Sequence, residues 1–225
     1  MTSRDAAWSA LGQVRDPELD RPITDLGFVA TLTVEGSAVR AELRLPTYFC
    51  APNFAWLMVA DARDALAALG ARAEVVLLDH FASEEINAGV AALDDFATSF
   101  GGRDDPDLAA LRATFERKAH VAAQERLARA LVGAGLDPDR LRTVTLGDAA
   151  RLAPDEAAAV ARRRARLGLA TGYALCDDAG RQLDGERLPV WLRFARTVRV
   201  SIDGNAAFCR GLLETRYDLA LPPPR

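Results

Sequence analysis

The sequence predicts an α+β fold, in which a small α-β-β-α-β domain with a mixed sheet precedes a mostly helical C-terminal region. In the first 80 residues, segments that alternate between apolar and polar residues are separated by segments with a helical repeat. After a break at 101–106 that contains glycines and a proline, apolar residues recur mainly at helical spacing. We therefore expect a domain of residues 1–100 and an extension of residues 107–225.

The N-terminal domain is expected to begin with a helix over residues 5–15, whose apolar side chains share one face. The helix ends at Asp16-Pro17, because the residue before a proline is disfavoured in helical conformation. Apolar and polar residues then alternate over 28–34 and 38–45, which predicts two strands. The short connection between them contains Gly36 and is typical of a hairpin, so these strands should be antiparallel.

A second helix is expected from Pro52 to Gly70, followed by a third strand over residues 73–78. Pro52 suits the first turn of a helix, where a missing backbone N–H costs nothing, and Gly70 ends the helical repeat. The strand–helix–strand unit forms a crossover that should be parallel and right-handed. These elements complete the α-β-β-α-β order.

The C-terminal region is expected to contain a long helix over residues 108–133 and a shorter one over residues 155–167. Two short strand candidates follow at 172–175 and 197–202. Asn205 could then cap a final helix. The region is therefore mostly helical.

The charged residues of this region allow a functional and a structural interpretation. Four arginines within residues 162–166 could grip a phosphate or an acidic partner, but such a run is more often a solvated helix face. Glu116 and His120, four residues apart, could share a metal with a partner helix, yet without a second pair a solvated Glu–His pair is favoured. Cys176 and Cys209 are expected to be core cysteines.

Composition excludes several classes of protein. Half of the residues are hydrophobic and 27% are charged, which is typical of a folded globular chain rather than a disordered one. The net charge of −4 argues against nucleic-acid binding, which needs a basic face. No apolar stretch is long enough for a membrane span, and no signal-peptide core follows Met1. Three widely spaced cysteines without an export signal indicate reduced thiols and a cytoplasmic protein.

The predicted topology brings distant side chains to one edge of the sheet. Asp25 precedes the first strand, Cys50 follows the second, and Asp79-His80 follows the third. Ligand sites of open α/β sheets lie at the carboxyl ends of parallel strands, which is this edge. Carboxylate, thiolate and imidazole groups all bind metals. We therefore predict a metal or thiol site formed by Cys50, Asp25, Asp79 and His80, although a turn aspartate and a surface-loop histidine are the alternatives.

Cys50 is the central residue of this predicted site. It lies between a strand and the N-terminus of a helix, where free backbone N–H groups and the helix dipole favour thiolate over thiol. The alternative is that Cys50 is a small buried apolar residue. A thiol enzyme would need a base, and His80 is the histidine expected near Cys50. The sequence has no Walker loop, Gly-x-Gly-x-x-Gly or Cys-x-x-Cys motif.

Three segments in order resemble the iron–sulfur cluster assembly family, including its SufT-like and PaaD-like members. They are Asp16-Pro17-Glu18-Leu19, Ile23-Thr24-Asp25-Leu26-Gly27-Phe28-Val29, and Leu45-Pro46-Thr47-Tyr48-Phe49-Cys50. The resemblance covers roughly residues 5–80 and implies that Cys50 is the reactive cysteine, supported by Thr47 and Pro52. Two features differ from the family pattern: Ala51 separates Cys50 from Pro52, and the chain beyond about residue 100 has no counterpart.

This resemblance implies a non-enzymatic maturation factor that assembles or delivers an iron or iron–sulfur centre. Its partners would be a client metalloenzyme, for which a bacterial di-iron monooxygenase is a reasonable class, and other cluster-assembly proteins. The extension would tailor the domain to one client. Because a cluster usually needs about four thiolates, the cargo would be held transiently or shared by Cys50 of two chains in a homodimer. The alternatives are a client-specific adaptor in which Cys50 only packs, and a thiol enzyme using Cys50 with His80.

Overall fold

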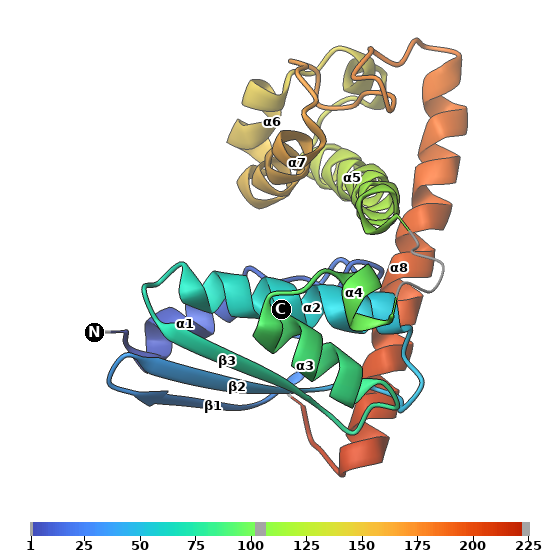
Figure 1. Ribbon diagram of the computed structural model, residues 1–225. Helices are drawn as coiled ribbons and strands as arrows, with labels where there is room; N and C mark the ends of the chain where they lie inside the picture. Colours follow the sequence, from blue (N-terminus) through green and yellow to red (C-terminus); the bar gives the residue numbers. More distant parts are fainter. Residues whose placement is uncertain (1, 102–106, 222–225) are drawn as a thin grey trace. The chain divides into compact units, whose positions relative to one another are not determined.

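The computed structural model describes residues 2–101 and 107–221, and the chain divides into two compact units (Figure 1). The first unit comprises Met1–Leu108 together with the chain from Gly204 onward, and the second comprises Ala109–Asp203. The break predicted at 101–106 falls largely on residues 102–106, which lie outside the described residues. The sequence prediction assigned all of 107–225 to one extension, whereas this division returns the chain after Gly204 to the first unit.

The first unit contains the expected order of helix, two strands, helix and strand. The sheet order is β1-β2-β3, with β1 antiparallel to β2 and β2 parallel to β3, as predicted. Two short helices follow β3, and the last turns of α8 complete the unit. The bounds are α1 Arg4–Leu11, β1 Val29–Glu35, β2 Ala38–Arg44, α2 Pro52–Ala67, β3 Arg72–Leu78, α3 Ser83–Ala92 and α4 Phe96–Ser99.

One face of this sheet is buried and the other carries charged side chains. Along β2, Val39, Ala41 and Leu43 are buried, and they belong to the core to which α1 and α2 also contribute. Arg40 alternates with these residues along β2. On the face of the sheet away from the core, it forms ion pairs with Glu42 and Glu74. The period of two in the sequence therefore separates a core face from a polar face. Figure 1 shows α2 lying over one side of the sheet.

The second unit is helical and has its own core. The long helix α5 and the helix α7 confirm two predictions, whereas the strand candidate at 172–175 is reduced to a single bridge between Thr145 and Tyr173. The core is formed by buried side chains that include Leu127, Leu131 and Val160. The bounds are α5 Leu108–Gly133, the 3-10 helix η1 Pro138–Arg142, α6 Leu146–Leu152, α7 Pro154–Leu167 and α8 Arg187–Tyr217, whose first part belongs to this unit.

The prediction of a strand at 197–202 and of a new helix capped by Asn205 is wrong, because both segments lie inside α8. Valine, threonine and isoleucine favour strands, which explains the error. The buried residues of α8 instead recur at helical spacing, as Ala195, Ile202, Ala206 and Leu213 show. Packing of this face therefore overrides the local strand propensity. Among the described residues, no helix is long and apolar enough to cross a membrane.

Candidate functional site

The carboxyl ends of β2 and β3 lie at one edge of the first unit, which we call the rim. Cys50 follows β2 and precedes α2, while Asp79 and His80 follow β3 directly. The His80 Nε2 atom lies 2.7 Å from the carbonyl oxygen of Cys50, and the Phe81 N–H donates to the carbonyl of Tyr48 at 3.2 Å. Two loops that are distant in sequence are thus joined at the rim, as the parallel pairing of their strands requires.

His80 supports the backbone of the Cys50 loop. The Ala82 N–H donates to His80 Nδ1 at 3.2 Å, so Nε2 carries the ring proton and donates to the Cys50 carbonyl. The ring is buried, and this burial lowers the pKa of His80, as does the positive charge of Arg216. Both nitrogens of the neutral ring are therefore used by the protein. His80 lies at the predicted edge, but its contacts are those of a structural support rather than of a metal ligand or a base for the thiol.

The Cys50 side chain is free and half-buried, and its sulfur lies 3.4 Å from the hydroxyl oxygen of Thr47. α2 begins at Pro52, as predicted, and the preceding Ala51 has no side chain that could cap the helix. The thiol therefore stands two residues before the first turn of α2 with a hydroxyl as its polar neighbour. A half-buried thiol is more open to a reagent or a metal ion than a fully buried one, which is inert.

The Asp16-Pro17-Glu18-Leu19 segment forms a tight turn in the loop between α1 and β1. The buried carboxylate of Asp16 accepts hydrogen bonds from the N–H groups of Glu18 at 2.9 Å and Leu19 at 2.8 Å. Burial outweighs these bonds and raises the pKa of Asp16 to about 6. Leu19 is buried in the core of the unit. The helix predicted over residues 5–15 ends earlier than expected, because α1 stops at Leu11 with Gly12 as its C-cap. Pro17 therefore belongs to the turn that Asp16 orders and does not end the helix.

The two remaining residues of the predicted site, Asp25 and Asp79, are held through their backbones. Arg210 donates to the carbonyl of Asp25 at 3.1 Å, and Arg216 donates to the carbonyl of Asp79 at 2.6 Å. Arg216 also donates to the carbonyl of Leu45 at 3.1 Å. The last turns of α8 therefore fasten the three segments that meet at the rim. Asp79 is exposed and adopts a positive φ of 48°.

The predicted ligand set does not form a closed metal site. In the part of the chain that the structure describes, no three His, Cys, Asp or Glu side chains are grouped so that they could hold a metal ion. Cys50 and His80 come together, but the contact is made by the Cys50 backbone and not by its sulfur. A metal ion bound here would therefore rely on the Cys50 thiolate and on further groups that the prediction did not include.

Sequence reasoning did not place Cys209, which lies in the part of α8 that belongs to the first unit. Cys209 is half-buried and packs against the same core as Cys50. Burial raises the pKa of Cys209 to about 11, and the negative charges of Asp16 and Cys50 act in the same direction. The four-residue spacing from Cys209 to the buried Leu213 places both residues on one face of a helix, and it was the available signal. The spacing does not indicate which of the two cores this face packs against.

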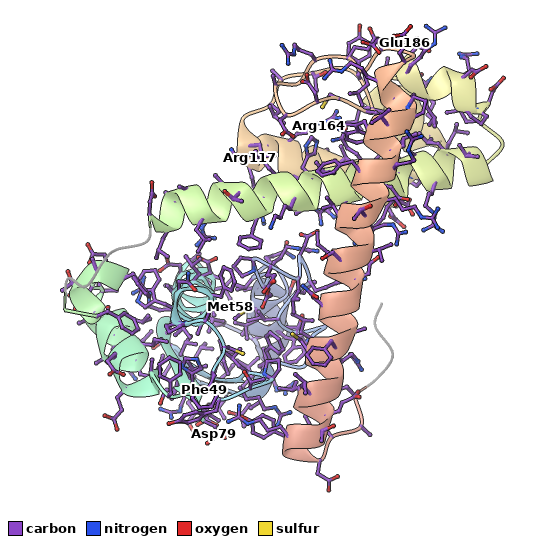
Figure 2. The ribbon with its side chains drawn as sticks, turned by 90° about the vertical axis from the view of Figure 1, so that its right-hand side faces the viewer. Phe49, Met58, Asp79, Arg117, Arg164 and Glu186 are labelled. Atoms are coloured by element: carbon purple, nitrogen blue, oxygen red, sulfur yellow. The ribbon has the colours of Figure 1, made fainter. Side chains whose placement is uncertain are left out.

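Three exposed aromatic side chains beside Cys50 form a second feature that was missed. Tyr48, Phe49 and Phe81 are 47%, 76% and 46% exposed, and we call them the aromatic patch. Their ring centroids are 4.9 Å apart for Tyr48–Phe49, 6.2 Å for Tyr48–Phe81 and 5.9 Å for Phe49–Phe81. Figure 2 shows Phe49 at the same end of the unit as Asp79. Exposed aromatic groups of this kind mark surfaces that bind other proteins.

Three of the residues singled out in the extension, Arg164, His120 and Cys176, form a buried cluster. Arg164 donates to His120 at 3.2 Å, to the carbonyl of Ala174 at 2.8 Å and to the sulfur of Cys176 at 3.4 Å. Arg163 is buried as well, so the prediction of a solvated arginine face is wrong for these two residues. Further bonds of this cluster join Arg164 to Gln124 and to the carbonyl of Tyr173, and Cys176 N–H to Gln124.

The prediction of a solvated Glu116–His120 pair is also wrong. His120 is buried, and burial together with the charges of Arg164 and Arg163 lowers its pKa to about 4. Glu116 pairs instead with Arg166 at 3.3 Å. The neutral His120 ring accepts a bond from the Arg164 guanidinium, and this buried contact joins α5 to α7 within the second unit. Cys176 is buried, as expected for a core cysteine.

The comparisons with known proteins agree with the geometry of the rim. Residues 4–77, about a third of the chain, match the model of the family described as iron–sulfur cluster assembly protein. The match contains the Asp16 turn, Asp25, Cys50 and nearly all of β3, and it excludes α8. No curated protein and no solved structure matches the chain. Residues 4–77 are thus similar to the iron–sulfur cluster assembly family.

Proposed function

We propose that this protein is a maturation factor that helps to assemble an iron or iron–sulfur centre, or deliver it to a client metalloenzyme, with Cys50 as its reactive thiol. The observation that carries the proposal is the half-buried Cys50 sulfur, held at the rim inside the segment that matches the assembly family. In this role the metal centre is cargo, and the protein itself is not an enzyme.

The local structure supports a transient thiol ligand. Thiolates are the ordinary ligands of iron–sulfur clusters and of soft metal ions. His80 fixes the carbonyl of Cys50 and Thr47 contacts its sulfur, so the thiol has a defined place on the surface. One thiolate at an open site binds cargo weakly enough for a client with more ligands to remove it. Sharing by Cys50 of two chains in a homodimer is the second route to the same chemistry.

The aromatic patch supports delivery to a protein. It lies in the same loop as Cys50 and in the segment after β3, so a partner that covers Tyr48, Phe49 and Phe81 binds beside the Cys50 loop. Burial of aromatic rings contributes strongly to protein association. The resemblance to PaaD-like members makes a bacterial di-iron monooxygenase the client class that we propose, with other cluster-assembly proteins as donors. We propose that this exchange takes place in the cytoplasm, where thiols stay reduced.

The aromatic patch also favours a second function, that of a client-specific adaptor without metal chemistry. An adaptor needs the patch but not the thiol. The thiol-enzyme alternative has less support, because both nitrogens of His80 bind backbone groups and neither contacts the Cys50 sulfur. The two favoured functions therefore differ in what the Cys50 sulfur contributes.

Co-expression with a di-iron monooxygenase from the same genome separates the two functions. We compare the Cys50→Ser variant with Cys176→Ser, which makes the same atom change in the second unit, and with Phe49→Ala. A maturation factor loses client iron content and activity with Cys50→Ser and with Phe49→Ala but not with Cys176→Ser. If Cys50→Ser leaves client iron and activity unchanged while Phe49→Ala lowers them, the metal-delivery role is wrong and the adaptor role stands.

A further inference from the structure

We propose that β1 is a dimerisation strand, along which a second copy of this chain adds its own β1 in the antiparallel direction. The two three-stranded sheets then form one continuous sheet of six strands. This interface lies along the free edge of the sheet, away from the thiol chemistry of the proposed function. Either proposal can therefore fail without the other.

The two edges of the sheet differ in how their backbone groups are used. β3 forms one edge, and there the Asn87 side chain of α3 donates to the carbonyl of Leu77 at 3.0 Å and accepts from its N–H at 2.8 Å. α3 therefore closes this edge. β1 forms the other edge (Figure 1). Among the residues that the structure describes, no hydrogen bond joins the backbone of Val29–Glu35 to any element other than β2.

The hairpin turn determines which backbone groups of β1 face the free edge. Glu35 opposes Ala38 across a two-residue turn, in which Gly36 has a positive φ of 62°. Such a turn is closed by a hydrogen-bonded pair, and bonded and non-bonded pairs alternate along an antiparallel ladder. Glu35 therefore bonds to β2, whereas the N–H and C=O groups of Val34 and Leu32 point away from it. These four groups are available to another strand.

The residues of β1 do not protect this edge from pairing. Natural edge strands are usually protected by charged side chains, prolines, a short length or a covering helix. β1 has seven residues, Val-Ala-Thr-Leu-Thr-Val-Glu, and Glu35 is its one charged side chain. By contrast, β3 contains Arg72 and Glu74 and is also covered by α3. β-Branched residues favour pairing within a sheet, so β1 has the composition of an inner strand at an open edge.

A second copy is the occupant that we assign, because this edge is complementary to itself. With the two-fold axis at Thr33, Leu32 of each copy pairs with Val34 of the other, so all four free backbone groups of each copy are bonded. On the core face, this pairing places the buried Leu32 beside the partly buried Val34 of the other copy. On the solvent face, the two exposed Thr33 side chains meet, and threonine pairs of this kind stabilise antiparallel sheets.

The charges of β1 agree with this register. Glu35 opposes the uncharged Thr31 of the other copy, so no like charges lie directly opposite each other. The two Glu35 side chains are four strand positions apart, which is about 13 Å along the sheet. This separation exceeds the screening length of about 8 Å at physiological ionic strength. A charged foreign segment would find one acidic side chain to recognise on β1, whereas a second copy needs none.

The dimer separates the two rims. β1 begins at the rim, where the carbonyl of Phe28 accepts a hydrogen bond from the N–H of Arg44 at the end of β2. Antiparallel pairing reverses the second copy, so its rim lies at the other end of the six-stranded sheet. The two Cys50 thiols do not meet in this dimer, and both aromatic patches stay open to a client. This dimer therefore favours transient binding of the cargo by one thiolate over sharing by two Cys50 residues.

Light scattering and analytical ultracentrifugation of the full-length protein over a range of concentrations test the proposal. We expect a dimer that dissociates on dilution, because a single strand pair is a small interface. Thr33→Lys places two like charges opposite each other on the two-fold axis and should raise the dissociation constant roughly tenfold. Thr31→Lys is the matched control, since it makes the same change on the same face but opposes Glu35 of the other copy. It should leave the dimer as tight or tighter.

A monomer at every concentration, or a Thr33→Lys dimer as tight as the unmodified one, would overturn the proposal. Equal weakening by both substitutions would also contradict it, because the register centred on Thr33 requires opposite signs.

Amide hydrogen exchange of the unmodified chain, resolved by NMR, does not depend on how a variant folds. We expect the amides of Leu32 and Val34 to exchange slowly at high concentration and quickly on dilution. The amide of Glu35 bonds to β2 and should be protected at both concentrations. Exchange at Leu32 and Val34 that does not change with concentration would refute the dimer. The proposed function is tested separately by the client's iron content with Cys50→Ser.

Discussion

Cys50 at the rim and Cys176 in the second unit are both free thiols with a polar neighbour, yet their surroundings differ in every other respect. Cys50 is half-buried beside the hydroxyl of Thr47, and the strong hydrogen bonds of its loop go to backbone groups. Cys176 is fully buried, and its sulfur accepts a bond from the guanidinium of Arg164. The polar groups of the rim thus position a thiol, whereas those of the second unit enclose one.

The difference shows what each polar network stabilises. At the rim, His80 and Arg216 tie loops together, while Cys50 is half-buried and the aromatic patch is exposed. In the second unit, the Arg164 guanidinium donates hydrogen bonds to the buried carbonyls of Tyr173 and Ala174. A charged group is tolerated in the interior only when it is paired or hydrogen-bonded in this way. We therefore expect changes in the second unit to affect stability most, and changes at the rim to affect thiol chemistry most.

The largest effect on stability is expected for Arg164→Met. This change leaves His120 and the carbonyls of Tyr173 and Ala174 without their donor, so the free energy of unfolding should fall by about 3–5 kcal/mol. Urea denaturation measures the loss. Arg162→Met on the same helix is the matched control, because Arg162 is exposed and its loss should stay within about 0.5 kcal/mol. Equal losses for both variants would show that the cluster does not stabilise the second unit.

A pH-dependent loss of stability is expected from His120. Its pKa falls from 6.5 to about 4 on folding, so the folded state favours the neutral ring. The unfolded chain therefore binds more protons between these values, and the contribution of His120 is complete above pH 6.5 and is lost as the pH falls through about 4. The full loss is about 3 kcal/mol.

Denaturation of the unmodified chain and of His120→Gln at a series of pH values measures this contribution. The variant should lose less stability than the unmodified chain between pH 6.5 and pH 4, since glutamine does not titrate. Parallel curves for the two proteins would mean that His120 is accessible to protons in the folded chain.

A smaller effect is expected at the rim for His80→Leu. The change leaves the carbonyl of Cys50 and the N–H of Ala82 without their partners, which should cost about 2 kcal/mol. Thermal denaturation measures the loss, and Glu84→Gln, an exposed residue at the start of α3, is the control. The pKa of His80 is also lowered, so its contribution is complete above pH 6.5 and declines as the pH falls. A His80→Leu variant as stable as Glu84→Gln would contradict the support that we assign to this ring.

Much of the first unit could be predicted from sequence because its signals are local. Alternation over β1 and β2, the short turn at Gly36 and the proline at the start of α2 each reflect steric rules, and the pairing of strands then places His80 beside Cys50. The family match confirms the resemblance that three short motifs indicated. Local periodicity was therefore enough to predict which strand ends meet at the rim.

The remaining features depend on contacts between residues that are far apart in the chain. Cys209 packs against the core of the first unit as part of α8, a single helix whose continuity the strand-like residues 197–202 concealed. Arg164 lies in a run that resembles a solvated face, and its burial depends on acceptors from α5 and from the segment before α8. A single sequence does not contain the information that pairs such residues.

The rate at which each cysteine is alkylated in the folded, unmodified chain tests the central claim most directly. Brief iodoacetamide treatment followed by peptide mapping gives the three rates separately. We predict that Cys50 reacts first, because it is only half-buried just before the N-terminus of α2, and that Cys209 is slower, because burial and nearby charges raise its pKa to about 11. Cys176 should react only after unfolding, since it is buried. Labelling of Cys176 as fast as Cys50, or no labelling of Cys50 in the folded chain, would contradict the claim that Cys50 is the reactive thiol.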